Sequence, residues 1–272
     1  DLDWLHQFAE RARADGITLR PYIGYTPAWA TVPGRGDGQA WNDPPRDLEA
    51  WERFVDTLVR SMSRHDHIAS WEIYNEQNAR LWWDGTPEEY DSTLARGLRA
   101  ARRANPKATV FPGGLVWADA DWMEHTCATA NRYGGLPIAA VHAYPETWTP
   151  DSVTVERWLD ANYRDDYLGA MTESCGPVPV WINEAGFATW KGKSEQEQAA
   201  WWVRAFGTWL ALPRIEHIGI YEIRDAKPGT EVIGDAANLH LGLLTSDGRP
   251  KLAFHTVKML VSLFDTGRLT VA

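Results

Sequence analysis

The sequence has little positive charge, and it has no long apolar run. Its 272 residues include 27 Lys and Arg against 37 Asp and Glu, which gives a formal net charge of -10. Proteins that bind a nucleic-acid backbone or an anionic membrane surface rely on clustered Lys and Arg, so we expect no nucleic-acid and no membrane partner. No apolar stretch approaches the roughly 20 residues that cross a bilayer.

Cysteine and cofactor motifs are also scarce. Cys127 and Cys175 are too few for a disulfide framework and too isolated for a zinc site, and they leave the redox compartment open. The run His65-Asp66-His67 stands between a predicted helix end and a strand start, which favours a solvated turn over a metal site. No phosphate-binding glycine loop and no Gly-x-Ser-x-Gly turn occurs. We expect neither a metal nor an organic cofactor.

No signal peptide is recognisable, and the location of the protein stays open between secreted and cytoplasmic.

Short apolar runs alternate with longer amphipathic ones, which is typical of repeated βα units. We expect strands at residues 17–25, 68–75, 109–112, 138–144, 178–184 and 217–223. Helical periodicity and capping motifs predict helices around residues 5–12, 51–62, 87–104, 121–133, 155–167, 195–210 and 251–264. A chain of this length suits one α/β barrel domain over residues 1–272, because such barrels commonly run to about 250 residues.

The strand inventory is two short of a complete barrel, and the chain opens on a helix that should follow a strand. We therefore expect a TIM (β/α)8-type barrel without its first two βα units. The strands at 17–25 and 217–223 would be unpaired edges. The chain would then be a fragment or, as we favour, a homo-oligomer that covers the open edge with another copy. The strand-like residues 268–272 could pair at one edge.

Two predicted strands end in an Asn-Glu pair, Asn75-Glu76 and Asn183-Glu184. A glutamate at the C-terminal end of a barrel strand is poorly explained by packing, and barrels keep their active sites at this rim. Each glutamate could form a structural ion pair, but two in equivalent positions favour a function. Paired carboxylates suit glycosidic cleavage, in which one protonates the leaving oxygen and the other attacks the anomeric carbon.

Further motifs stand at the other predicted strand ends and loops. They are Tyr25-Thr26-Pro27-Ala28-Trp29-Ala30, Pro112-Gly113-Gly114-Leu115, His142-Ala143-Tyr144-Pro145, Tyr221-Glu222-Ile223-Arg224-Asp225 and Gly242-Leu243-Leu244. With the two Asn-Glu pairs, they make nearly the whole chain resemble the clan A glycoside hydrolases, and most of all glycoside hydrolase family 39. Gln77 departs from the resemblance, because the similar proteins usually have proline there, and we expect the departure to be tolerated.

The resemblance implies roles for five residues. Glu76 would be the general acid/base at the end of the fourth barrel strand, and Glu184 the nucleophile at the end of the seventh. Asn75 would bind the sugar 2-hydroxyl, and Tyr144 would orient the nucleophile. His142 would line the same subsite, although it could instead be a core histidine bonded to a backbone carbonyl.

Of the 16 tryptophans, twelve fall into two groups. Six stand just past strand ends, where an indole could stack on a sugar: Trp29, Trp82, Trp83, Trp117, Trp148 and Trp190. We expect roughly half of these to contact substrate, with Trp29, Trp117 and Trp190 the first candidates. Six others are expected to pack helices on the sheet: Trp51, Trp122, Trp158, Trp201, Trp202 and Trp209. Glu222 and Arg224, on the last strand, either bind substrate hydroxyls or pair with each other.

These features predict a retaining O-glycosidase that cleaves β-linked oligo- or polysaccharides by double displacement. Two alternatives use the same residues. A carbohydrate-binding pseudo-enzyme would keep the aromatic rim on a barrel too incomplete for catalysis, and a transglycosylase would differ only in acceptor access. An assay on aryl glycosides separates the enzyme from the pseudo-enzyme.

Overall fold

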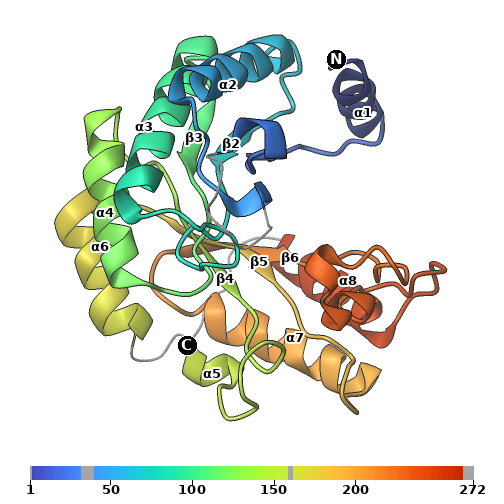
Figure 1. Ribbon diagram of the computed structural model, residues 1–272. Helices are drawn as coiled ribbons and strands as arrows, with labels where there is room; N and C mark the ends of the chain where they lie inside the picture. Colours follow the sequence, from blue (N-terminus) through green and yellow to red (C-terminus); the bar gives the residue numbers. More distant parts are fainter. Residues whose placement is uncertain (1, 32–39, 159–161, 266–272) are drawn as a thin grey trace. The chain divides into compact units, whose positions relative to one another are not determined.

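The computed structural model describes residues 2–31, 40–158 and 162–265 (Figure 1). The chain forms two compact units: Asp1–Ala140 with Tyr167–Pro179, and Val141–Asp166 with Val180–Ala272. The described residues include six strands, which form two sheets of three in the orders β1-β2-β3 and β4-β5-β6. The α/β class and the six predicted strands are therefore confirmed. Residues 268–272, predicted to be strand-like, lie outside the described residues.

The strands are short, and each overlaps a predicted one. They are β1 (Tyr22–Ile23), β2 (Ser70–Ile73), β3 (Thr109–Pro112), β4 (Ala139–Ala143), β5 (Val180–Ala185) and β6 (Ile215–Ile220). The prediction of a strand over 17–25 was too long. Leu19 forms only an isolated bridge with Ile68, and Pro21 has no N–H to donate to a ladder. The last strand ends at Ile220, so Glu222 lies beyond it.

In the first unit, parallel pairing places Tyr22 beside Glu72, and Ile73 beside Pro112. The unit also contains most of the helices. They are α1 (Asp3–Ala14), α2 (Leu48–Met62), α3 (Pro87–Ala104), α4 (Ala120–Arg132) and α6 (Leu168–Cys175), with the short 3-10 turns η1 (Ala28–Ala30) and η2 (Ala40–Asn42). Helices α2 and α3 pack side by side, as Figure 1 shows. Because Val55, Leu94 and Leu98 are fully buried, this packing forms the core of the unit.

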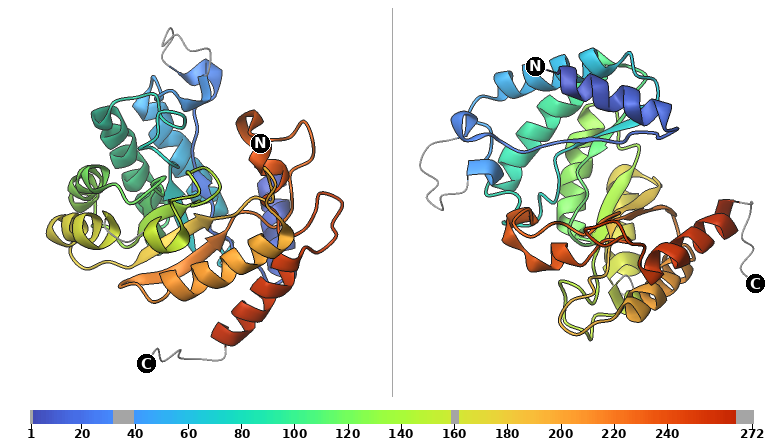
Figure 2. Two further views of the ribbon diagram at one scale, coloured as in Figure 1. Left: turned by 90° about the horizontal axis from the view of Figure 1, so that it is seen from below. Right: turned by 90° about the vertical axis from the view of Figure 1, so that its right-hand side faces the viewer.

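In the second unit, β5 pairs in parallel with β6. Its helical elements are α5 (Val155–Trp158), the π-helical η3 (Asn162–Tyr167), α7 (Glu195–Trp209), the 3-10 turns η4 (Val232–Gly234) and η5 (Ala236–Leu239), and α8 (Leu252–Asp265). Helices α7 and α8 lie against each other (Figure 2). Three tryptophans of α7, at 201, 202 and 209, are fully buried, as expected for helix–sheet packing. Burying a large apolar side chain contributes about 1.5–3 kcal/mol.

Local sequence signals set the helix boundaries. Thr86 caps α3 and Ser194 caps α7, each in a capping box with the glutamate three residues later. The helix starts that capping motifs predicted at residues 87 and 195 are therefore confirmed. The helix predicted over 155–167 was wrong in its extent, because α5 ends at Trp158 and a π-helical segment leads into α6, which continues to Cys175. None of the helices in the described part of the chain combines the length and the apolar character of a membrane span.

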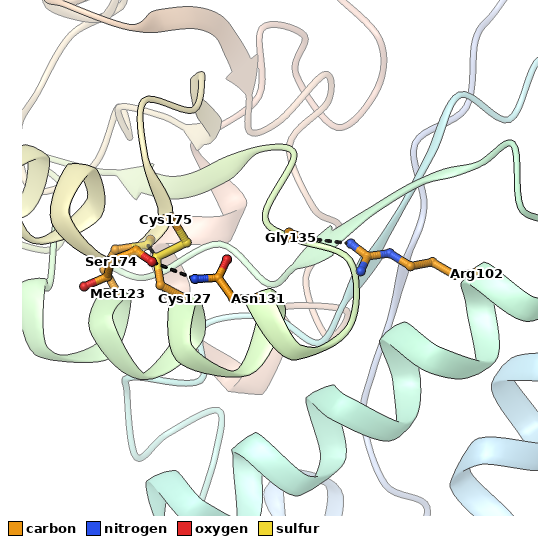
Figure 3. Close-up of a disulfide and its surroundings, with 7 residues drawn as sticks. All are labelled: Arg102, Met123, Cys127, Asn131, Gly135, Ser174 and Cys175. Atoms are coloured by element: carbon orange, nitrogen blue, oxygen red, sulfur yellow. Dashed lines mark hydrogen bonds between the residues drawn. A yellow bond between two sulfur atoms is a disulfide. The ribbon is translucent and has the colours of Figure 1, made fainter.

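A disulfide joins Cys127 of α4 to Cys175 at the end of α6 (Figure 3). The Asn131 side chain donates a hydrogen bond to the carbonyl of Ser174 at 2.7 Å beside it. The two cysteines are 48 residues apart in sequence, and in the chain-entropy model a cross-link of that span stabilises a fold by about 4 kcal/mol. The sequence left these cysteines without an assigned role.

Candidate functional site

The first group of candidate residues lies at the end of β2, in the first unit. Asn75 and Glu76 follow the strand directly, and both are buried. The Nδ2 of Asn75 donates to the hydroxyl of Tyr25 at 3.0 Å, and the N–H of Glu76 donates to the carbonyl of Gly114 at 2.9 Å. The Asn-Glu pair is therefore fixed by neighbours from the ends of β1 and β3, as strand-end residues of a parallel sheet should be.

Aromatic side chains surround Tyr25 in the same unit. Its ring stacks on Trp82, with centroids 5.8 Å apart, and meets Trp41 edge-on at 5.5 Å. Burial raises the pKa of the Tyr25 hydroxyl above its usual value, so this group stays a neutral hydrogen-bonding partner of Asn75. An aromatic wall beside a polar pair is the kind of surface that binds a sugar ring.

The other rim tryptophans of the first unit differ in exposure. Trp29 is 75% exposed in η1, and Trp117 is 46% exposed. Trp83 is buried between Tyr74 and Tyr90, with ring centroids 5.0 and 5.7 Å away. Trp83 therefore packs in the interior beneath its loop, whereas Trp29 and Trp117 present indole surface to solvent.

The second group of candidate residues lies at the ends of β4 and β5, in the second unit. The hydroxyl of Tyr144 donates a hydrogen bond to Oε2 of Glu184 at 2.8 Å. The Nδ1 of His142, whose side chain is fully buried, lies 3.5 Å from the same oxygen. Since β4 and β5 are neighbours in the sheet, their ends bring a phenol, an imidazole and a carboxylate together. A carboxylate held by such a donor keeps one orientation, which an attacking group requires.

Tyr144 is itself held by aromatic neighbours. Its ring lies 4.4 Å from that of Trp148 and 6.1 Å from that of Tyr221. Trp190 packs against the buried cluster that contains Tyr144 and Leu241. Trp190 is therefore half-buried at this group, while Trp148 is 43% exposed.

Glu222 follows β6 in the second unit and is half-buried. Burial raises the pKa of its carboxyl group to about 7, and the nearby Asp225 adds to the increase. Asp225 is bound to the buried Lys251 at 2.8 Å. Glu222 and Arg224 form no ion pair in the described structure, so pairing with each other does not explain these two residues.

The run His65-Asp66-His67 is not the solvated turn that the sequence favours. His65 is 5% exposed, and its Nε2 lies 2.9 Å from Nδ1 of His6 in α1. The Nε2 of His67 lies 2.8 Å from the carbonyl of Ala9. Helix α1 covers this turn and takes it out of solvent, which the local sequence did not indicate. Asp66 alone is exposed and pairs with Arg13.

Two residues of these groups received no role from the sequence. Tyr25 ends the predicted first strand and stands in a motif of the resemblance, and that position was a signal for its contact with Asn75. Trp41 has no comparable signal, because it reaches Tyr25 from η2, which no predicted helix or strand covers. Contacts of this kind depend on the fold and not on local spacing.

Comparison with known proteins identifies the fold. No family model matches the chain. A protein of Oryza sativa subsp. japonica that carries the name of a mannan endo-1,4-beta-mannosidase is 28% identical over 204 residues, which is 68% of this chain and 38% of that protein. The chain thus spans well under half of the length of this relative.

Two solved structures are similar over nearly the whole chain. GH5_18 from Streptomyces cattleya, in complex with GlcNAc, has a TM-score of 0.75 at 19% identity. The match covers 100% of this chain and 68% of the GH5_18 chain. A monomeric beta-xylosidase from Caulobacter crescentus CB15 has a TM-score of 0.72 at 17% identity. The match covers 96% of this chain and 56% of the xylosidase chain. The structural neighbours are clan A glycoside hydrolases with TIM barrels. The α/β fold with six parallel-type strands is therefore that of a partial TIM barrel.

Proposed function

We propose that the chain is a retaining glycoside hydrolase for β-linked sugars, with Glu184 as nucleophile and Glu76 as general acid/base. The observation that carries the proposal is the 2.8 Å hydrogen bond from Tyr144 to Glu184. The phenol stabilises the negative charge of the carboxylate, and the ionised form is the one that attacks a sugar carbon. The fully buried His142 imidazole lies 3.5 Å from the same oxygen and adds a second polar neighbour to the carboxylate.

The chemistry takes two displacements. Glu184 attacks the anomeric carbon, the glycosidic C–O bond breaks, and Glu76 gives its proton to the leaving oxygen. Water then attacks the same carbon, its proton passes to Glu76, and the bond to Glu184 breaks. Two inversions at one carbon give net retention. The mechanism needs the two carboxyl groups about 5–5.5 Å apart.

The remaining candidates bind the sugar in this proposal. Asn75, held by Tyr25, donates to the 2-hydroxyl, a contact that strengthens as the oxocarbenium ion develops. His142 lines the same subsite beside Glu184. Glu222, whose carboxyl group is protonated below about pH 7, donates to a substrate hydroxyl. The indoles of Trp29, Trp117 and Trp190 stack on sugar faces.

The substrate class follows from the relatives by name. One carries the name of a mannan endo-1,4-beta-mannosidase and another is a beta-xylosidase, so β-1,4-mannan and β-xylosides are the first substrates to test. Both have an equatorial leaving group, which the nucleophile displaces from the opposite face of the sugar in the first step. The proposed partner is carbohydrate, and a second copy of the chain covers the open edge of the sheet.

A panel of aryl β-glycosides and β-1,4-mannan tests the proposal. Wild-type protein should release product, and Glu184→Ala should abolish release. Glu76→Ala should lose about 10²- to 10⁴-fold on substrates with poor leaving groups and regain activity with azide as an external nucleophile. Glu197→Ala, which removes only a helix-capping carboxylate, should retain wild-type kinetics. Wild-type protein that binds these sugars without cleaving them would instead establish the pseudo-enzyme.

A further inference from the structure

The turn after β2, which carries Glu76, has an uncommon backbone conformation. Tyr74 has a φ of 76° and Glu76 a φ of 50°. Both values lie in the left-handed region, which residues other than glycine seldom adopt. Such a conformation persists only where surrounding contacts hold it. The contacts of this turn therefore decide where the Glu76 carboxyl group lies.

A glycine pair after β3 supplies several of these contacts. The N–H of Gly113 donates to the carbonyl of Ile73 at 2.8 Å, and the N–H of Glu76 donates to the carbonyl of Gly114 at 2.9 Å. The N–H of Gly114 donates to Oε1 of the buried Glu72 at 2.6 Å. Gly114 is thus held on both sides, by Glu72 through its N–H and by Glu76 through its carbonyl.

Gln77 adds a side-chain bond to the same glycine pair. The residue is 1% exposed, and its Nε2 donates to the carbonyl of Gly113 at 2.8 Å. A Cβ at position 113 would lie 2.5 Å from Oε1 of Gln77 and 2.7 Å from the carbonyl carbon of Tyr74. Gln77 and Gly113 are therefore complementary, because the amide occupies space that only a glycine leaves open. A proline at position 77 would have no side-chain donor for this carbonyl.

We propose that Gln77 is a positioning residue for Glu76. Its amide ties the turn to the glycine pair directly after the acid/base residue, and so fixes the direction of the Glu76 side chain. The inference rests on the proposed function, because it concerns the placement of a general acid. A displacement of about 1 Å at a reacting group can cost about 10²-fold in rate, so one hydrogen bond of this kind is kinetically important.

A positioning role differs from a merely structural one in its dependence on the leaving group. A poor leaving group, such as an alkoxide, needs the proton of the general acid, whereas dinitrophenolate departs without it. Misplacement of Glu76 therefore lowers kcat on alkyl glycosides and spares dinitrophenyl glycosides. A smaller fraction of folded protein lowers the rate on both substrates equally.

The test compares Gln77→Met with wild-type protein. Methionine keeps the length and volume of glutamine and removes the donor. We expect kcat to fall about 10- to 100-fold on an alkyl β-glycoside and less than about 3-fold on the dinitrophenyl glycoside, with KM unchanged. The control is Asn131→Leu, which removes an amide-to-carbonyl bond elsewhere in the same unit and should leave both rates unchanged. Gln77→Glu, which keeps the shape without an amide donor, serves if the Met variant does not fold.

Hydrogen exchange of residues 74–79, followed by mass spectrometry, measures the turn without any activity. Exchange should be faster in Gln77→Met than in wild-type protein, and unchanged in Asn131→Leu. Equal loss on both substrates, or unchanged exchange in the Gln77 variant, would overturn the positioning role. If wild-type protein cleaves no glycoside, the proposed function fails, and the exchange data still decide whether Gln77 holds this turn.

Discussion

The hydroxyl of Tyr144 donates to Oε2 of Glu184 at 2.8 Å across the ends of neighbouring strands β4 and β5. Replacing Tyr144 with Phe keeps the ring that packs on Trp148 and removes this bond. We expect kcat to fall about 10²-fold, because a preorganised donor at the reacting carboxylate is lost. Steady-state kinetics on an aryl β-glycoside measures the effect.

The control for this substitution is Tyr163→Phe. Tyr163 is buried in the same unit, and its hydroxyl donates to the carbonyl of Pro213 at 2.8 Å. Its loss should lower the free energy of unfolding by about 1 kcal/mol and leave kcat unchanged. If the Tyr144 and Tyr163 variants had similar kinetics, the Tyr144 hydroxyl would have no special role in catalysis.

Alanine at the exposed rim tryptophans should weaken substrate binding without destabilising the fold. Trp29→Ala and Trp117→Ala each remove an indole that makes few buried contacts, so Tm should hardly change while KM for an oligosaccharide rises several-fold. Trp190→Ala should raise KM and also lower Tm, because Trp190 packs on the Tyr144 cluster. Calorimetry with oligosaccharide titration measures both quantities. Unchanged KM in the Trp29 and Trp117 variants would exclude these two from the binding surface.

The features that could be predicted from sequence are those with local signals. The capping boxes at Thr86 and Ser194 set two helix starts, and strand-end position alone singled out Glu76 and Glu184. Apolar periodicity gave most of the helices within a few residues, but it missed the end of α5 at Trp158 and the separate helix α6.

The features that could not be predicted join residues far apart in the chain. Asn75 and Tyr25 are 50 residues apart, the two cysteines 48, and His6 and His65 59. None of these contacts has a spacing that a local pattern reveals. Gln77 was expected to be a tolerated departure. Its side-chain bond to Gly113 depends on the pairing of β2 with β3, which brings the ends of these two strands together.

Stability should fall at mildly acidic pH because of His65. Burial, with the charges of His6, Arg64 and His67, lowers the pKa of His65 below its ordinary value of 6.5, and Glu10 opposes the shift. The unfolded chain then binds more protons than the folded one as pH falls through 6.5, so the folded state loses stability below that pH and keeps it above. Urea titrations between pH 5 and 8 measure the slope.

The matched variants for this prediction are His65→Gln and His255→Gln. The first removes the buried imidazole and should flatten the dependence of unfolding free energy on pH below 6.5. The second removes an exposed imidazole and should leave the dependence as it is in wild-type protein. An unaltered slope in the His65 variant would assign the acid sensitivity to other groups.

The protein should self-associate through its sheet edges. Among the described strands, β1 pairs only with β2, and β6 only with β5, and such edges recruit further strands. Light scattering should give a mass above that of one chain. Tyr22→Lys, at an exposed position of β1, should shift the distribution toward monomer, whereas Phe54→Lys, at an equally exposed position of α2, should not. An active wild-type monomer would contradict this prediction.

Covalent trapping tests the central claim most directly. A 2-deoxy-2-fluoro β-glycoside with a dinitrophenyl leaving group slows both displacements but keeps the first one fast enough to accumulate the glycosyl-enzyme. With the sugar that the glycoside panel identifies, peptide mass spectrometry should find one label per chain, on Glu184. The Glu184→Ala variant should remain unlabelled. Active protein that takes up no label and releases the inverted anomer, or a label on any other residue, would contradict a retaining mechanism with Glu184 as its nucleophile.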